Sequence, residues 1–408
     1  MVKASIIPLL LATPLGAYAA WETVPEVSIF AETEDNVLLE AGADTQSASR
    51  TGLDATITTT NFDERGSFYI QPRIITDAYS DADAKNFESD DVFFDTGGQY
   101  SWRVVGVGFR SSYSEELILN SEFVSAIPGD PDLDPSDDFT DPDTGRLVLF
   151  TEQREIFNIR GNLDFRISER NQLRFEATRQ DVAYTGGQLF DRSNFDNNSL
   201  SLAILRRVDE RNSVSARMTV SEYYSDSADN TTDSVGVEGT FTRPIAQTWD
   251  FTLRAGVQRS EYDFLQSSSV RVANAATAPT FGIGFRKRAE RTTWNLDFSH
   301  RSQPSGNGFL VVREEIRAFA QHEFTQRLAG RVGLIYSQTE TLDDVRTSDN
   351  RDYARADVGL EWALKQTLFV SVGLQRSSQK FVNETSAQST SNALVAGITY
   401  RGRSRQNQ

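Results

Sequence analysis

Two residues with the chemistry of a hydrolase stand close together late in the chain, within the stretch FSHRSQPSGNG of Phe298–Gly308. His300 is one of only two histidines in the 408 residues, and Ser302 follows two positions later. A histidine that takes the proton of a serine hydroxyl makes that oxygen a nucleophile towards esters, provided that a third group orients the imidazole ring. The sequence names no such third group, so the pair is a hypothesis about ester hydrolysis and not an assignment.

The His-x-Ser spacing resembles that of the outer-membrane lipid hydrolases, phospholipase A and the lipid A deacylases, which carry it on a barrel strand. The phospholipase family places an asparagine on the following strand, and residues 308–324, GFLVVREEIRAFAQHEF, contain none. Those enzymes are also much smaller barrels. We therefore interpret His300 and Ser302 as a polar strand end in the headgroup zone, with a lipid esterase as the alternative, and His322 as an interfacial residue near a turn.

An aspartate-rich segment is the second candidate for chemistry. Its sequence DPDLDPSDD lies within residues 115–154, which we expect to form a long acidic extracellular loop. Spaced carboxylates suit calcium, but the run lacks the glycine and the closing glutamate of an EF-hand loop. A solvated loop is the simpler interpretation, and bridging to lipopolysaccharide through divalent ions is a further hypothesis. The carboxylates are Asp130, Asp132, Asp134, Asp137 and Asp138.

The elements that must position these residues are strands, because apolar and polar residues alternate with a period of two along most of the chain. In EIFNIRGNLDFRIS the apolar Phe157, Ile159, Leu163 and Phe165 alternate with Asn158, Arg160, Asn162 and Asp164. A soluble β-sandwich also alternates, but its strands are usually about five or six residues long. These runs last about ten residues, the length that a tilted strand needs to cross a bilayer.

The connections predict a transmembrane antiparallel up-and-down β-barrel of 16–18 strands. Short turns are centred near residues 63, 102, 169, 209, 244, 290, 326 and 364, and long polar segments such as YTGGQLFDRSNFDN and QSSSVRVANAATA lie between them. Short periplasmic turns opposite long extracellular loops are typical of outer-membrane barrels. With a first strand near Glu26–Thr33 and a last near Ala393–Arg401, the count is eighteen, and both termini are periplasmic.

The alternation assigns the charged residues to the inner wall. A barrel of this size is too wide for side chains to fill, so it leaves an aqueous lumen whose charged walls select solutes. The predicted lumen-lining residues, together with Asp164, are Arg160, Arg166, Arg174, Glu176, Arg217, Glu238, Asp250, Arg254, Asp297, Arg317, Arg331, Arg355, Asp357 and Glu361. The alternative is a lumen closed by salt bridges and the acidic loop.

Composition and targeting signals agree with this location. Residues 1–19 have the positive start, apolar stretch and Ala17-Tyr18-Ala19 cleavage site of a signal peptide. No later segment has the roughly 18 consecutive apolar residues of a spanning helix. The formal net charge of −17 argues against nucleic acid as a partner. Residues 20–408 are expected to form one domain that ends in a periplasmic tail, 402–408, with no cofactor and no metal.

The whole chain resembles the porin-like outer-membrane β-barrels of Gram-negative bacteria. The segments EVSIFAETEDNVLL and FYIQPRIITDAYS are similar to the start of a β-barrel porin group whose members are often associated with exopolysaccharide genes. The resemblance implies an outer-membrane location and traffic of polysaccharide or solutes. From the wide lumen we predict passive passage of small hydrophilic solutes or saccharides, and no enzyme. A closed structural, adhesive or exopolysaccharide-associated barrel is the alternative. Outer-membrane proteins usually end on an aromatic residue, whereas here RGRSRQNQ follows Tyr400. Oligomeric state stays open.

Overall fold

The computed structural model describes most of the chain after its first 19 residues. The described ranges are 20–37, 39, 45–80, 88–118, 152–185, 194–226, 230–267, 270–304, 310–341, 350–381, 388–403 and 405–407. Within them the regular structure is β-strand throughout. The predicted signal peptide and the Asp-rich run lie outside the described residues.

The described residues form nineteen strands, which follow one another along the chain. They are β1 (Ala20–Glu34), β2 (Ala48–Phe62), β3 (Gly66–Tyr79), β4 (Asp90–Ser101), β5 (Val105–Ile118), β6 (Glu152–Arg166), β7 (Asn171–Thr185), β8 (Phe195–Arg207), β9 (Ser213–Ser225), β10 (Asn230–Ala246), β11 (Trp249–Ser267), β12 (Val270–Ala289), β13 (Thr292–Pro304), β14 (Leu310–Glu323), β15 (Leu328–Thr341), β16 (Arg351–Lys365), β17 (Leu368–Phe381), β18 (Ser389–Arg401) and the short β19 (Arg405–Asn407).

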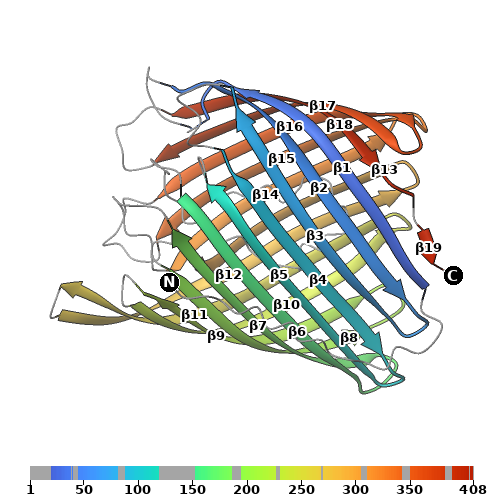
Figure 1. The fold of residues 1–408 in the computed structure, drawn as a ribbon. Coiled ribbons are helices and arrows are strands. Elements are labelled where there is room, and N and C mark those ends of the chain that lie inside the picture. Colours follow the sequence, from blue (N-terminus) through green and yellow to red (C-terminus); the bar gives the residue numbers. More distant parts are fainter. Residues whose placement is uncertain are drawn as a thin grey trace.

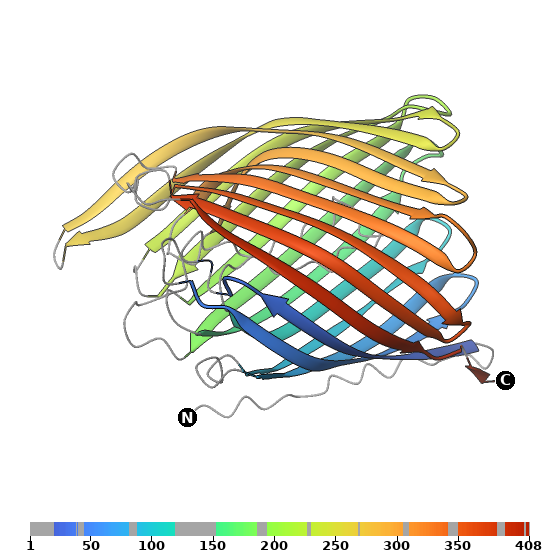
Figure 2. The same cartoon turned by 90° about the horizontal axis from the view of Figure 1, so that it is seen from above.

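The first eighteen strands form a closed antiparallel barrel. Each pairs with its neighbour in sequence, and β1 pairs with both β2 and β18, so the sheet has no free end. Closure removes the exposed sheet edges that would otherwise bind other chains. The tilted strands wrap around one axis in Figures 1 and 2. The predicted fold and the count of eighteen strands are confirmed.

The two ends of the barrel differ as predicted. At one end the strands are joined by tight turns, for example residues 63–65, 102–104, 290–291 and 366–367. The connections at the other end include residues 35–47, 119–151 and 342–350. β1 begins and β18 ends at the end of the barrel that has the tight turns. Ala20 of β1 pairs with Phe62, next to the turn at 63–65, and the N–H of Arg401 donates to the carbonyl of Thr367 in the turn at 366–367. We call these the turn end and the loop end.

Two local predictions were wrong. The turn centred on residue 244 lies at residues 247–248, because β10 continues through Pro244 with a register shift before Ala246. The segment QSSSVRVANAATA, predicted as a long loop, mostly forms the paired ends of β11 and β12. Its small and polar residues lack an apolar face, which is why it resembles a loop in sequence. This hairpin projects beyond its neighbours in Figures 1 and 2.

The apolar residues face outward, as the alternation predicts. Phe157 and Ile159 are exposed on the outer wall, whereas Asn158 between them is buried. Leu200 in β8 has 62 % of its surface exposed, far more than a core leucine. The outer wall therefore presents an apolar surface that water does not stabilise, while the polar residues face the interior of the barrel.

Candidate functional site

The inner wall carries ion pairs between neighbouring strands. Arg160 of β6 contacts Glu176 of β7 with 2.7 Å between nitrogen and oxygen, and Arg174 of β7 contacts Asp164 of β6 at the same distance. Gln172 also donates to Asp164. These four charged residues were predicted for the lumen, and the structure brings them together in two pairs. Each pair is partly shielded from water, which strengthens it relative to a fully exposed pair.

A third ion pair spans two strands at once. Arg254 of β11 reaches Asp297 of β13 at 3.0 Å, across the intervening strand β12. Glycine makes this approach possible, because a Cβ at Gly282 would lie 3.1 Å from Nε of Arg254, and one at Gly284 would lie 3.1 Å from Oδ2 of Asp297. Side chains at these positions would crowd the pair. The sequence placed both charges on the inner face but did not pair them.

These strands surround a hollow of about 970 Å³ inside the barrel. Arg174, Arg254 and Asp297 lie on its wall. Four more residues from the predicted lumen set line it as well: Arg166, Arg217, Glu238 and Asp250. Arg217 and Glu238 face each other in the register of β9 and β10. A hollow with alternating positive and negative groups can hold water and hydrophilic solutes, and it offers little to an apolar ligand.

The remaining predicted residues lie on strands β14 to β16. Nε of Arg317 is 2.5 Å from Glu315 of the same strand. Arg331 lies over Gly359, and Asp357 lies over Gly333 on the neighbouring strand. Arg355 and Glu361 share the face of Asp357 on β16 and are half-buried. Their placement on the inner face follows from the period of two, and their role towards solutes stays a prediction.

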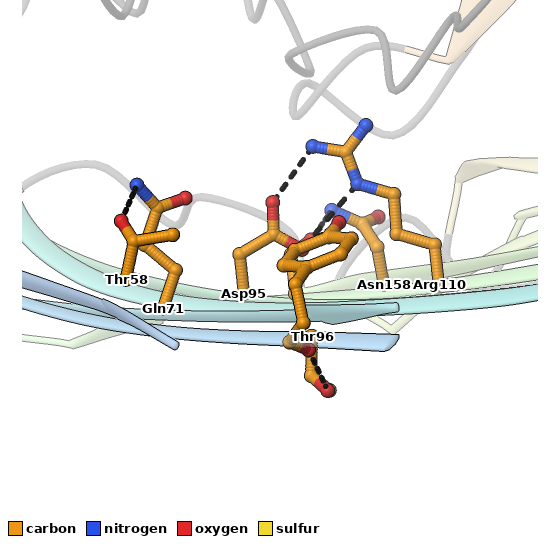
Figure 3. Close-up of polar contacts among 8 residues, drawn as sticks. Thr58, Gln71, Asp95, Thr96, Arg110 and Asn158 are labelled. Atoms are coloured by element: carbon orange, nitrogen blue, oxygen red, sulfur yellow. Dashed lines mark hydrogen bonds and ion pairs between the residues drawn. The ribbon is translucent and has the colours of Figure 1, made fainter. Parts of the chain in front are cut away.

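Sequence reasoning missed the charged residues of the first five strands. Arg110 of β5 and Tyr69 of β3 both donate to Asp95 of β4, and Arg73 pairs with Asp54. In Figure 3, Asp95, Arg110 and Asn158 project from the same side of the sheet, while Thr96 projects from the other. The same alternation would have found them, but the first two hairpins lacked a clear run of alternating apolar residues.

All of these ion pairs run along the wall. Within the described ranges, the contacts named here between inward-facing Arg and Asp or Glu join residues of the same, adjacent or next-adjacent strands. Such pairs stiffen the wall by joining neighbouring strands.

Inner-wall side chains towards the loop end are more deeply covered. Arg154 is fully buried and lies 2.7 Å from Glu116, and Arg313 and Glu315 form a second buried pair. A small apolar cluster of Ile156, Val182, Phe195 and Tyr223 lies on the same wall. Burying charge is costly unless it is paired, so these contacts fix the wall near the loop end.

His300 and Ser302 face outward, away from this site. The ring of His300 stacks on Phe281 with 4.7 Å between centroids, and its Nδ1 lies 2.9 Å from a carboxylate oxygen of Glu314. Glu314 lies opposite His300 in the register of β13 and β14. The sequence named no third group for the pair, and the structure provides one. The sequence held a signal for this contact, because His300 and Glu314 lie equally far before and after position 307, as partners in a hairpin do.

Among the described residues no helix is long and apolar enough to cross a membrane. No family model matches the chain, and no curated protein matches it. Solved structures similar to it include OccAB2 of Acinetobacter baumannii, at 9 % identity and TM-score 0.45 over 95 % of this chain and 98 % of that one. The outer membrane protein OpdK from Pseudomonas aeruginosa is 10 % identical, with a TM-score of 0.46 over 94 % and 99 %.

The ferric-catecholate import receptor Fiu of E. coli K12 is 8 % identical, with a TM-score of 0.44 over 92 % of this chain and 81 % of that one. These likenesses are too distant to assign an activity. The pairing of the strands and the division between an apolar outer wall and a charged inner wall are the better indications of function.

Proposed function

We propose that the protein is a porin-like barrel that gives small hydrophilic solutes or saccharides passive passage across the outer membrane of a Gram-negative bacterium. The observation that carries the proposal is the closed barrel itself, with exposed apolar residues outside and ion pairs that run along a hollow inside. Only a closed barrel or a helix satisfies all backbone hydrogen bonds in lipid. A signal peptide at residues 1–19 takes the chain to the periplasm.

The charge pattern of the inner wall supports hydrophilic solutes over apolar ones. Arginine and carboxylate side chains offer donors and acceptors to hydroxyl groups without forming one deep binding pocket. Solutes then enter and leave without tight binding, as conduction requires. Lipids and lipopolysaccharide contact the outer wall, and no nucleic acid or cofactor takes part.

Recording from planar bilayers tests this function. Purified protein inserted into a bilayer is expected to give discrete conductance steps, and proteoliposomes that contain it should swell in small sugars. A chain that is folded, as judged by its heat-dependent gel mobility, and still gives neither signal would contradict passive transport. The same two measurements on a chain lacking residues 119–151 separate a barrel closed by that segment from one that cannot conduct.

A closed structural barrel, associated with exopolysaccharide or adhesion, is the second candidate. The burial of Arg154, Arg313 and Arg351 on the inner wall towards the loop end favours it, because an open water-filled mouth would leave such side chains exposed. This function predicts no conductance from the intact chain and binding of polysaccharide at the loop end. The two candidates therefore differ in a single recording.

A further inference from the structure

We propose that Ser302, His300 and Glu314 form a site on the outer wall that hydrolyses the acyl esters of membrane lipids. The site is separate from the lumen and from solute passage. It joins a hydroxyl, an imidazole and a carboxylate on two adjacent strands, all on the lipid-facing side. These are the three groups that nucleophilic ester hydrolysis requires, in the order nucleophile, base and orienting acid.

The imidazole is held from two sides. Glu314 accepts a hydrogen bond from Nδ1 of His300 at 2.9 Å, which leaves Nε2 as the nitrogen free to take a proton. Phe281 stacks on the ring with 12° between the planes and fixes its orientation. His300 is largely covered while Glu314 remains half-exposed, so the carboxylate stays accessible to water. A polar strand end in the headgroup zone needs neither the hydrogen bond to Glu314 nor the stacking on Phe281.

Ser302 lies on the same face of β13, one full strand period beyond His300. Its Oγ is buried and has no hydrogen-bond partner among the described residues. A buried hydroxyl without a partner costs free energy, so it gains from any acceptor that it can reach. Ser302 and His300 are two residues apart on one face of β13, and contacts between base and nucleophile are often loose before substrate binds.

We assign the backbone N–H of Ser302, at the end of a ladder, as the donor for the oxyanion. The backbone carbonyl of Arg291 accepts a hydrogen bond from the N–H of Glu323 of β14. The backbone N–H and C=O groups of odd-numbered residues of β13 therefore point to β14, and those of even-numbered residues point to β12. The ladder between β12 and β13 ends at the pair Phe281 and His300, one pair before Ser302. The reciprocal pair of ladder bonds therefore ends before Ser302. A backbone N–H beside the nucleophile can stabilise the charge on a tetrahedral intermediate.

The height of the site fits the position of lipid esters. Below His300 on the outer wall lie the apolar Phe298, Leu296 and Ile316, and level with it lie Glu314 and Gln338. Polar residues thus interrupt the apolar surface at the row of His300, with Phe281 beside it and Val312 one row beyond. Ester groups lie at the same boundary, between the acyl chains and the headgroups. Glycerophospholipids and acylated glycolipids share this chemistry.

The reaction balances without any further reactant except water. Ser302 Oγ attacks the ester carbonyl carbon as its proton moves to His300 Nε2, and the carbon–oxygen bond to the lipid alcohol breaks as that proton passes to the leaving oxygen. The acyl group is then on Ser302. Water, deprotonated by His300, attacks this ester, and Oγ leaves with the proton, which releases a fatty acid. Glu314 acts as a positioning residue throughout.

The test uses the full chain folded in vesicles, with free fatty acid as the readout. One set of vesicles contains phosphatidylethanolamine and phosphatidylglycerol only, and a second also contains lipid A, so that the two sources are distinguished. Ser302→Ala should abolish release, and His300→Asn should lower it by about 100-fold or more. Ser299→Ala, a seryl change on the inner face of the same strand, is the matched control and should leave release unchanged.

Two further readouts separate catalysis from structure. An alkyl fluorophosphonate should modify Ser302 in the wild-type chain and fail to do so in His300→Asn, whatever lipid is present. Glu314→Gln should lower kcat without changing KM, and Glu314→Asp should restore part of it. Fatty acid release that persists in Ser302→Ala, or a folded wild-type chain with neither release nor labelling, would overturn the site. Neither result bears on conductance.

Discussion

At the scale of single residues, the ion pair between Arg254 and Asp297 determines the charge that solutes meet at one part of the inner wall. Both side chains are mostly covered, and two glycines of β12 leave room for their contact. Paired in this way, the two charges nearly cancel. Removing one of them leaves the other unpaired towards the lumen, where the low-dielectric protein wall focuses its field on passing ions.

Asp297→Asn is therefore expected to make the pore more selective for anions. The guanidinium of Arg254 loses its carboxylate partner and attracts chloride, which shifts the reversal potential measured under a gradient of potassium chloride. Asp181→Asn is the control, because Asp181 pairs with Arg179 at 2.9 Å on the exposed outer face. An equal shift in both variants would mean that the wall charge of Arg254 does not face the ion path.

At the scale of elements, the seam where β18 meets β1 decides whether the sheet closes. Asp35, just beyond β1, accepts a hydrogen bond from the backbone N–H of Asn392 at 2.7 Å and another from its side-chain amide at 2.8 Å. Partial burial raises the pKa of Asp35, but these bonds and one from Ser391 outweigh it and hold the pKa below its usual value. The ionised carboxylate of Asp35 thus stabilises the contact between β18 and β1.

A carboxylate with a lowered pKa stabilises the folded state above its unfolded pKa, and this contribution is lost as pH falls through the folded value. Asp35→Asn should therefore speed hydrogen exchange around Ser391 and Asn392 at neutral pH. Compared at the same acidic pH, below the lowered pKa, wild type and variant should exchange alike. A difference that persists unchanged in acid would show that charge on Asp35 does not hold the seam.

The ladder between β12 and β13 ends for a reason that lies in one residue. Arg288 donates to Thr248 on the β11 side, so odd-numbered residues of β12 point towards β13. Pro279 is odd-numbered and lies where the next pair, with Ser302, would form. Proline has no N–H and cannot donate to the ladder. The ladder of reciprocal bonds therefore stops at Phe281 and His300.

Pro279→Val should extend this ladder by one pair. The new N–H can donate to the carbonyl of Ser302, which is worth about 1 kcal/mol. We expect slower hydrogen exchange at residues 277–281 and 300–302. Thr277→Val, which changes a neighbouring side chain without adding an N–H, is the control. Unchanged exchange in Pro279→Val would mean that the segments of β12 and β13 nearer the loop end, and not the proline, end the ladder.

At the scale of the whole molecule, stability depends on lipid covering the outer wall. Leu200 of β8 projects from this wall, while Ser201 beside it faces inward. Arginine on the lipid-facing side of a barrel costs about 2–4 kcal/mol near the bilayer midplane. Leu200→Arg should lower the free energy of unfolding in vesicles by about this amount, whereas Ser201→Arg should change it much less.

Refolding into vesicles, followed by heat-dependent gel mobility across a urea series, measures both variants. Equal effects of the two substitutions would contradict the division into a lipid-facing and a water-facing wall. The comparison uses adjacent residues of one strand, so differences in strand propensity are small.

The sequence by itself determined the fold class, a range of 16–18 strands and the face of the charged residues on the strands with clear alternation. The period of two is a local property, and it shows in runs such as Phe157–Ile159 and Asp250–Arg254 without any knowledge of their partners. Tight turns also leave local signals, so most of them were placed within a few residues. The turn predicted near residue 244 was misplaced because proline often marks a turn, whereas β10 continues through Pro244.

Only the tertiary structure decided which charged residues meet. The pairing of Arg254 with Asp297 depends on the register of three strands and on two glycines between them, and the contact of His300 with Glu314 depends on the register of a hairpin. Register is set by contacts between segments far apart in sequence, and a shift of one residue turns every side chain to the opposite face. Alternation specifies the face of each side chain, and pairing alone specifies its neighbours.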